Sequence, residues 1–236
     1  KYGEAVVSLP GGCAIGSRPI DLHLEAMKAL GAEVVLKDGY VHAKAKKLKG
    51  AHFLFENVTV GGTENMMMAA SLAEGTTVLE NVAKEPEIVD LAEYLNRMGA
   101  KISGYGTSVM KIQGVEKLKA AEHTIMPDRI EAGTLLIAGA ITGGEVTVED
   151  CNSHHIESLV LKLRESGFKV ETEETRVTVF PNKSWEAVDI TTAPYPLFPT
   201  DIQAQFMALM AVAEGTSVIS ETVFENRFMH VQELMR

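Results

Sequence analysis

A glycine-rich loop around a single cysteine contains the residue types best suited to chemistry. The run Gly11-Gly12-Cys13-Ala14-Ile15-Gly16-Ser17-Arg18 places a thiol five residues before an arginine. Because glycine and proline favour exposed loops, we expect both side chains to be accessible. A thiol near positive charge can lose its proton or attack an electrophile, and an arginine beside a helix N-terminus suits a phosphate or a carboxylate. An inert thiol at Cys13 and a solvated Arg18 stay open as alternatives.

A proline-rich approach to an apolar helix offers a candidate general base. The run Pro194-Tyr195-Pro196-Leu197-Phe198-Pro199 precedes Thr200, Asp201 and Gln203. Thr200 and Gln203 have the spacing of a capping box, which predicts a helix start there. Asp201 would lie in the first turn, as a base held on a rigid loop or as a carboxylate that complements the helix dipole. The run Asp128-Arg129-Ile130-Glu131 occupies the same place before an earlier apolar helix.

A second cysteine, Cys151, is followed closely by His154 and His155. The spacing matches no zinc template and lacks a second pair of ligands. Cys151 also occupies the position of Val82 in the preceding repeat described below. We therefore expect a packed thiol beside surface histidines, and no metal site.

These residues are spaced along a chain that repeats itself. Three glycines, at positions 31, 99 and 167, each follow a helix-like segment and precede a strand-like one, 68 residues apart. A second glycine marker, at positions 75, 144 and 215, repeats at intervals of 69 and 71 residues. Glycine at the end of a helix adopts a positive φ that costs other residues more. The spacing therefore predicts repeated helix–strand units.

One unit reads strand, helix, strand, helix and a final strand pair. We expect strands at 51–60 and 76–82, helices at 63–73 and 87–98, and a hairpin of 101–104 with 108–113. The order restarts with strands at 122–126 and 187–192, and an earlier helix begins at Pro19 and ends before Gly31. The first helix of each unit is apolar nearly all round, which predicts an interior position. The sequence thus predicts an α/β (α+β) fold with buried helices inside a shell that includes sheet.

The composition argues against several classes of function. The chain holds 22 Lys and Arg against 32 Asp and Glu, and its net charge of −10 argues against nucleic-acid binding. Hydrophobic residues make up 46% and charged residues 23%, as in folded globular proteins. No apolar run reaches the length of a membrane span, and the first residues have no signal-peptide pattern. Two cysteines make no disulfide framework, so the cytoplasm is the expected location.

Three segments resemble the signatures of the UDP-N-acetylglucosamine 1-carboxyvinyltransferase (enolpyruvyl transferase) family. They are the run from Gly11 to His23, the run Phe198-Pro199-Thr200-Asp201-Ile202-Gln203-Ala204-Gln205, and the run Glu221-Thr222-Val223-Phe224-Glu225-Asn226-Arg227-Phe228-Met229-His230. The resemblance implies an inside-out α/β barrel of βαβαββ units in two domains. Residues 1–126 would be part of the cysteine-loop domain and residues 127–236 part of the second. It also implies that the chain is an internal segment of a longer one, with a partial fold.

The resemblance implies transfer of the enolpyruvyl group of phosphoenolpyruvate to the 3′-hydroxyl of UDP-N-acetylglucosamine, with release of phosphate. This is the first committed step of peptidoglycan synthesis, on which cell-wall growth, cell shape and division depend. It requires no metal or other cofactor. Cys13 would be the proton donor and the thiol that fosfomycin alkylates, Asp201 the base, and Arg18 a ligand of phosphoenolpyruvate. The implied partners are these two small molecules, without nucleic acid or membrane.

The same resemblance implies a set of substrate-binding residues. They are Arg18, Pro19, Ile20, Asp21, Leu22, His23, Asn57, Val58, Thr59, Val60, Gly61, Asp201, Val223 and Arg227. The turn from Arg18 to Leu22, with His23, would hold the uridine nucleotide, and 57–61 would form a second contact with it. Asn57 departs from the family, which often has a lysine there.

Three alternatives stay open. The shikimate-pathway enolpyruvyl transferases share the repeat but do not rely on such a loop cysteine, so Cys13 favours the nucleotide-sugar branch. An RNA-3′-phosphate cyclase also shares the repeat, but a net charge of −10 disfavours an RNA substrate. The alternative from another class is a noncatalytic interaction module that kept the repeat. The segment alone is expected to be inactive.

Overall fold

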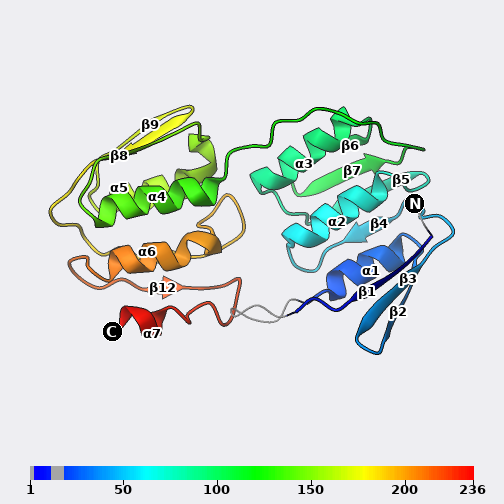
Figure 1. Cartoon of the computed structure of the whole chain (residues 1–236), viewed down its shortest axis with the longest axis horizontal. Helices are drawn as coiled ribbons and strands as arrows, with labels where there is room; N and C mark the ends of the chain where they lie inside the picture. The colour runs from blue at the N-terminus through cyan, green and yellow to red at the C-terminus, as the bar shows by residue number, and fades with distance from the viewer. Residues whose placement is uncertain (1–2, 12–18) are drawn as a thin grey trace. The chain divides into compact units, whose positions relative to one another are not determined.

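The computed structural model describes residues 3–11 and 19–236 (Figure 1). Cys13 and Arg18 lie outside the described residues, so the roles predicted for them stay predictions. Contacts divide the described chain into two compact units, of which the first ends at Ile125 and the second begins at Met126. Each unit has a hydrophobic core of its own.

The first unit contains one complete repeat. Its elements are β4 (His52–Leu54), α2 (Val60–Ala70), β5 (Thr76–Glu80), α3 (Pro86–Arg97), β6 (Lys101–Ser103) and β7 (Val109–Gln113). The strands form one sheet in the order β4-β5-β7-β6, in which β4 and β5 are parallel and the other pairs antiparallel. Helices α2 and α3 cover the same face of this sheet (Figure 1). This is the predicted βαβαββ order.

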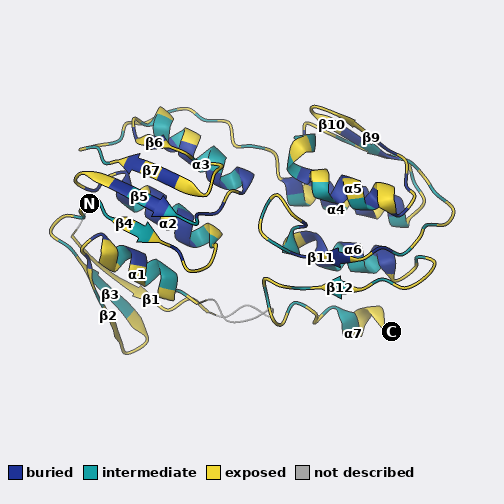
Figure 2. Cartoon of the chain, turned by 180° about the vertical axis from the view of Figure 1, so that it is seen from behind, coloured by how far each residue is buried: buried dark blue, intermediate teal, exposed yellow. Residues whose placement is uncertain are grey.

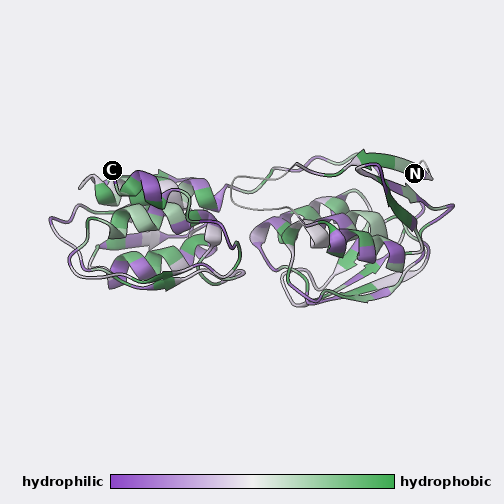
Figure 3. Cartoon of the chain, turned by 90° about the horizontal axis from the view of Figure 1, so that it is seen from below, coloured by the Kyte–Doolittle hydropathy of each residue, from purple (hydrophilic) through white to green (hydrophobic). Residues whose placement is uncertain are grey.

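A partial repeat precedes it and uses the same strand pairing. β1 (Glu4–Ser8) is followed by α1 (Asp21–Ala29) and by a hairpin of β2 (Glu33–Lys37) and β3 (Tyr40–Lys44). The sheet order β1-β3-β2 matches β5-β7-β6, with antiparallel pairs throughout. Figure 3 shows β1, next to the N-terminus, as a hydrophobic strand, and its Val6 and Val7 are exposed. α1 packs beside α2, so the two repeats share one helical layer.

The second unit repeats the pattern from its first helix onward. Its elements are α4 (Arg129–Ile141), β8 (Val146–Glu149), the 3₁₀ turn η1 (Ser153–Ile156), α5 (Glu157–Glu165), β9 (Val170–Glu173), β10 (Arg176–Val179), β11 (Ile190–Thr191), the 3₁₀ turn η2 (Thr200–Ile202), α6 (Gln203–Met210), β12 (Ile219–Ser220) and α7 (Val231–Leu234). The sheet order β8-β10-β9 again matches β5-β7-β6. β11 and β12 pair in parallel, as β4 and β5 do.

Glycines end the helices as predicted. Gly31, Gly99 and Gly167 have φ values of +89°, +100° and +97°, and each follows the second helix of its repeat. The second marker has its positive φ at Gly75 and Gly215, at +89° and +103°, as predicted. In the middle repeat it falls on Gly143, at +68°, rather than on Gly144. The turn between the apolar helix and the next strand is therefore one residue earlier than the sequence alignment of the repeats predicted.

Three predicted strand boundaries are wrong. The strand expected at 51–60 ends at Leu54, because the Thr59 side chain caps α2, which starts three residues earlier than predicted and ends at Ala70. The strand expected at 187–192 is reduced to β11. Residues 122–126 form no strand, since His123 instead bonds to Asp90 of α3 at 2.9 Å and stacks on a neighbouring tyrosine ring. Side-chain contacts thus replace sheet pairing there.

The predicted start of the first helix is also wrong. α1 begins at Asp21, and Ile20 is its N-cap residue, so Pro19 lies before the helix rather than in its first turn. Pro19 presets only its own φ, and the helix starts two residues later, with Ile20 between them.

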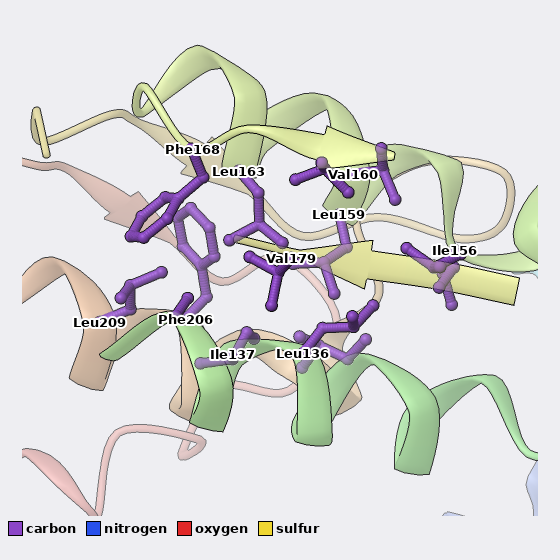
Figure 4. Packing of buried hydrophobic residues seen from close by; sticks show 14 of the residues in the cluster. Leu136, Ile137, Ile156, Leu159, Val160, Leu163, Phe168, Val179, Phe206 and Leu209 are labelled. Carbon is purple, nitrogen blue, oxygen red and sulfur yellow. The ribbon is translucent and has the colours of Figure 1, made fainter. Parts of the chain in front are cut away.

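The apolar helices lie in the cores, as predicted. Figure 2 shows buried residues gathered on α2 and β5 in the first unit and on α4 and α6 in the second. In the second core, Leu136 and Ile137 of α4 and Phe206 of α6 point toward residues of α5 and β10 (Figure 4). Phe206 also meets the ring of Phe198, 5.3 Å away between centroids. This packing holds α6 in place, and Asp201 lies in the η2 turn directly before it.

Candidate functional site

The starts of the apolar helices differ in how they are capped. Thr59 accepts a hydrogen bond from the Gly62 amide at 3.2 Å and caps α2. Asp128 accepts hydrogen bonds from two amides and caps α4. No side chain caps η2 or α6, so the predicted capping box of Thr200 and Gln203 is wrong. Both side chains instead bond to the segment 221–227, which leaves Asp201 in a turn held from outside the helix.

Asp201 and Arg227 form an ion pair at this turn. Arg227 Nη2 lies 2.8 Å from Asp201 Oδ1, and the two side chains are 18% and 50% exposed. Arg227 Nη1 also donates to Thr200 Oγ1 at 3.1 Å. The guanidinium carbon lies 5.4 Å from the centre of the Phe224 ring. A largely buried arginine thus holds a half-exposed carboxylate that a substrate can reach.

Glu221 lies at the centre of the same network. Its Oε1 accepts hydrogen bonds from Thr192 Oγ1 at 2.8 Å, from the Val223 amide at 2.8 Å and from the Phe224 amide at 3.1 Å. Its Oε2 accepts one from Thr200 Oγ1 at 2.8 Å. Burial alone would raise the pKa of Glu221, but these hydrogen bonds to the charged form outweigh it and lower the pKa. Glu221 thus joins the end of β11, η2 and the turn after β12.

Buried Gln203 and partly buried His230 lie close to Arg227. Gln203 is completely buried and donates from Nε2 to the Arg227 carbonyl oxygen at 3.3 Å. His230 follows in the same segment, and its pKa is lowered by burial and then by the nearby positive charge of Arg227. These contacts fix the backbone and the charge environment of the arginine.

A second group of predicted residues meets in the first unit. His23 of α1 and Asn65 of α2 approach to 2.7 Å between Nδ1 and Nδ2. A Cβ atom on Gly61 would lie 3.3 Å from the His23 ring, so the absence of a side chain makes room for the imidazole. Burial lowers the pKa of His23, and the charge of Asp21 offsets this in part. The predicted segments 19–23 and 57–61 therefore converge on His23.

A cavity of about 520 Å³ adjoins this histidine. His23 and Asn65 provide polar groups on its wall, and Ile20, Leu24 and Met68 provide apolar surface. Of the other predicted nucleotide contacts, Pro19, Asp21, Asn57, Val58 and Val60 are exposed, and Leu22 and Thr59 are partly buried. The segments are thus available to a ligand.

Asn65 and Glu221 are the functional candidates that the sequence reasoning missed. Asn65 follows Gly61 by four residues, a spacing that places both on one face of a helix, so its position beside His23 could have been inferred. Glu221 stands in a segment that the resemblance identified, but nothing in the sequence indicates four simultaneous hydrogen bonds to it.

The described residues include a packed cysteine, but neither a metal-binding cluster nor a membrane-spanning helix. No group of three or more His, Cys, Asp and Glu side chains could hold a metal ion within residues 3–11 and 19–236. Among the same residues, no helix is long and apolar enough to cross a membrane. Cys151 is 4% exposed, its Sγ donates to the Val148 carbonyl at 3.6 Å, and burial raises its pKa. The prediction of a packed thiol is confirmed.

Comparison with known proteins places this geometry in context. Residues 2–236 match the family model of EPSP synthase (3-phosphoshikimate 1-carboxyvinyltransferase). Along its whole length the chain is 75% identical to the UDP-N-acetylglucosamine 1-carboxyvinyltransferase of Bdellovibrio bacteriovorus and 58% identical to that of Geobacter metallireducens. It spans 57% of the length of each of these relatives.

Solved structures share the fold. The enolpyruvyl transferase NikO from Streptomyces tendae matches the whole chain with a TM-score of 0.86 at 24% identity, over 57% of its own length. The EPSP synthase of Acinetobacter baumannii matches 92% of the chain with a TM-score of 0.63 at 20% identity, over 51% of its own length. The expected α+β architecture of repeated βαβαββ units, present here in part, is confirmed.

Proposed function

This chain belongs to the EPSP synthase family, and we propose that it takes part in enolpyruvyl transfer from phosphoenolpyruvate to the 3′-hydroxyl of UDP-N-acetylglucosamine. The observation that carries the proposal is the 75% identity, along the whole chain, with a Bdellovibrio bacteriovorus protein of that activity by name. The chain spans 57% of that relative, so the activity is proposed for the full-length protein that contains these residues.

The proposed reaction needs an acid at carbon and a base at oxygen. The sugar 3′-oxygen forms a bond to C2 of phosphoenolpyruvate, its proton passes to a base, and C3 takes up a proton to become a methyl group. C3 then loses a proton, the bond from C2 to the phosphate oxygen breaks, and phosphate leaves. Positioned acids and bases supply large rate factors for such steps. No electrons are transferred, so the chemistry calls for no redox group.

Asp201 is the base in this proposal. It is half exposed, and Arg227 engages Oδ1, so Oδ2 can face a hydroxyl group. Two hydrogen bonds from Arg227 to Asp201 and Thr200 limit the motion of the turn. A base held in this way loses little freedom when substrate binds, which favours catalysis. Val223, whose amide bonds to Glu221, would line the sugar site beside it.

Cys13 is the acid and Arg18 a ligand of phosphoenolpyruvate in the same proposal. Both belong to the glycine-rich loop, and the reaction requires Cys13 as a free thiol, which fits a reducing compartment such as the cytoplasm. The uridine nucleotide would lie against His23 and the 57–61 turn, where Gly61 leaves room for the His23 imidazole. The product would be the first dedicated precursor of peptidoglycan.

The shikimate branch of the family is the competing assignment, because the matching family model carries that name. The cysteine in Gly-Gly-Cys-Ala-Ile-Gly favours the nucleotide-sugar branch, since that branch uses a loop thiol. The two assignments differ in acceptor and in thiol chemistry.

Thiol labelling tests the proposal with an internal control. The full-length protein is incubated with fosfomycin, with and without UDP-N-acetylglucosamine, and digested for mass spectrometry. We expect an adduct on Cys13 that forms faster with the nucleotide sugar, and none on the buried Cys151. Absence of a Cys13 adduct, or equal labelling of both cysteines, would contradict the proposal. A Cys13→Ser variant confirms the assignment of the modified peptide.

A further inference from the structure

Within residues 3–11 and 19–236, Glu221 forms no ion pair with a cation, although it has a depressed pKa and lies close to Arg227. Its four hydrogen-bond partners are two threonine hydroxyls and two backbone amides. One of those hydroxyls, Thr200 Oγ1, is shared with Arg227. The carboxylate of Glu221 is therefore linked to the arginine through a single hydroxyl group.

The direction of each hydrogen bond in this link is fixed by its ends. A carboxylate can only accept and a guanidinium can only donate. Thr200 must therefore donate its proton to Glu221 Oε2, 2.8 Å away, and accept from Arg227 Nη1, 3.1 Å away. The second terminal nitrogen of Arg227 is then directed at Asp201 Oδ1, 2.8 Å away. In this series of hydrogen bonds, each side chain orients the next.

We propose that Glu221 is a positioning residue, which through the Thr200 hydroxyl sets the orientation of the Arg227 guanidinium and so the direction in which Asp201 presents its carboxylate. The catalytic part of this inference rests on the proposed role of Asp201 as base, whereas the orientation of Arg227 does not depend on it. The anchoring is strong because Glu221 is itself held by β11 and by the turn after β12.

The charge of Glu221, and not only its shape, matters in this arrangement. In a Glu221→Gln variant, Oε1 can keep its three donors, but the amide nitrogen replaces Oε2 and becomes a donor toward Thr200. The Thr200 hydroxyl then faces donors on both sides, and its own proton loses the carboxylate oxygen that accepted it, so Glu221 no longer sets its orientation. The link is broken at nearly constant volume.

Paired variants of the full-length protein test the inference. Thr200→Val removes the hydroxyl with little change of shape, and Thr200→Ser retains it. Selective ¹⁵N labelling of arginine reports whether the two terminal nitrogens of Arg227 give separate signals, as expected for a fixed guanidinium. We expect separate signals in the parent and in Thr200→Ser, and averaged signals in Thr200→Val and Glu221→Gln. Separate signals that persist in Glu221→Gln would overturn the inference.

Turnover provides the second readout. We expect kcat to fall about tenfold to a hundredfold in Thr200→Val and in Glu221→Gln, as for small misplacements of a reacting group, with little change in the KM for the nucleotide sugar. Because both changes break one link, the double variant should lose no more than either single variant. Losses that multiply would contradict the inference. If the parent protein has no transferase activity, the proposed function fails, while the arginine signals still decide the positioning role.

Discussion

His23 Nδ1 lies 2.7 Å from Asn65 Nδ2, so the first turn of α1 is tied to α2 through an imidazole and an amide. With the amide nitrogen as donor, Nδ1 is the acceptor and the ring proton of neutral His23 resides on Nε2. Nε2 would be 3.7 Å from a Cβ on Gly61, on the side of the 57–61 turn. Asn65 therefore selects the tautomer that can donate to a ligand at that turn.

Replacing Asn65 by a carboxylate should reverse the pH dependence of this site. Burial holds the pKa of His23 below its usual value, so its contribution to stability is present above the unfolded pKa and is lost as pH falls through the folded value. In Asn65→Asp, the adjacent negative charge should raise the pKa of His23 above its unfolded value. The contribution of His23 to the stability of the fold should then be present below the unfolded pKa and be lost as pH rises through the new folded pKa. Histidine NMR titration and urea unfolding between pH 5 and 8, roughly the range in which histidine titrates, check both signs. Asn65→Leu serves as the uncharged control, and an unchanged His23 pKa in Asn65→Asp would refute the contact.

Mutagenesis can distinguish whether Asp201 acts as a general base or only complements a helix dipole. Asp201→Ala should lower turnover by about 100-fold or more, as expected for loss of a general base, and leave nucleotide-sugar binding measurable by calorimetry. Glu157 stands exposed in the first turn of α5 and provides the matched control. Glu157→Gln should cost about 0.3–1 kcal/mol of stability and leave turnover intact. Retained turnover in Asp201→Ala would remove that residue from the mechanism.

A substitution at Gly114 tests the close backbone packing between the end of β7 and the turn after α2. A Cβ atom at this position would overlap the Ala73 carbonyl oxygen and lie 2.8 Å from the carbonyl carbon, both of them backbone atoms. Gly114→Ala should therefore destabilise the fold by about 1–3 kcal/mol in denaturant unfolding, the usual range for overpacking. Gly144→Ala is the control, because its Cβ would have no neighbour closer than 3.8 Å. Equal stability of the two variants would contradict this packing.

Cys151 should behave as an inert thiol in the folded protein. It is 4% exposed and burial raises its pKa, so little thiolate is available to react. Iodoacetamide should modify it slowly under native conditions and rapidly in denaturant, as followed by peptide mass spectrometry. Fast native labelling at pH 7 would show that the thiol is accessible.

Local signals in the sequence predicted the repeat well. Glycines at positions 31, 99 and 167 fix helix ends by their positive φ, which depends on neighbouring residues alone. The same holds for the hairpin of β6 and β7. Helix period and glycine spacing were therefore sufficient to predict one βαβαββ unit and the partial repeats on either side of it.

Long-range contacts decided the elements that the sequence reasoning got wrong. Residues 122–126 stand where the repeat predicts a strand, but the bond from His123 to Asp90, 33 residues away, holds them against α3. Thr200 and Gln203 fit a capping box, yet Glu221 and the Arg227 carbonyl take their side chains. A local motif was overridden each time by a partner distant in sequence. The hydrogen bonds of Glu221 were missed for the same reason.

The most direct test of the account is an acceptor assay on the full-length protein. Phosphate release from phosphoenolpyruvate is followed with UDP-N-acetylglucosamine, with shikimate 3-phosphate, and with no acceptor. The account predicts release that requires the nucleotide sugar and yields the enolpyruvyl ether at its 3′-oxygen. Release that depends on shikimate 3-phosphate instead, or none with either acceptor, would contradict it.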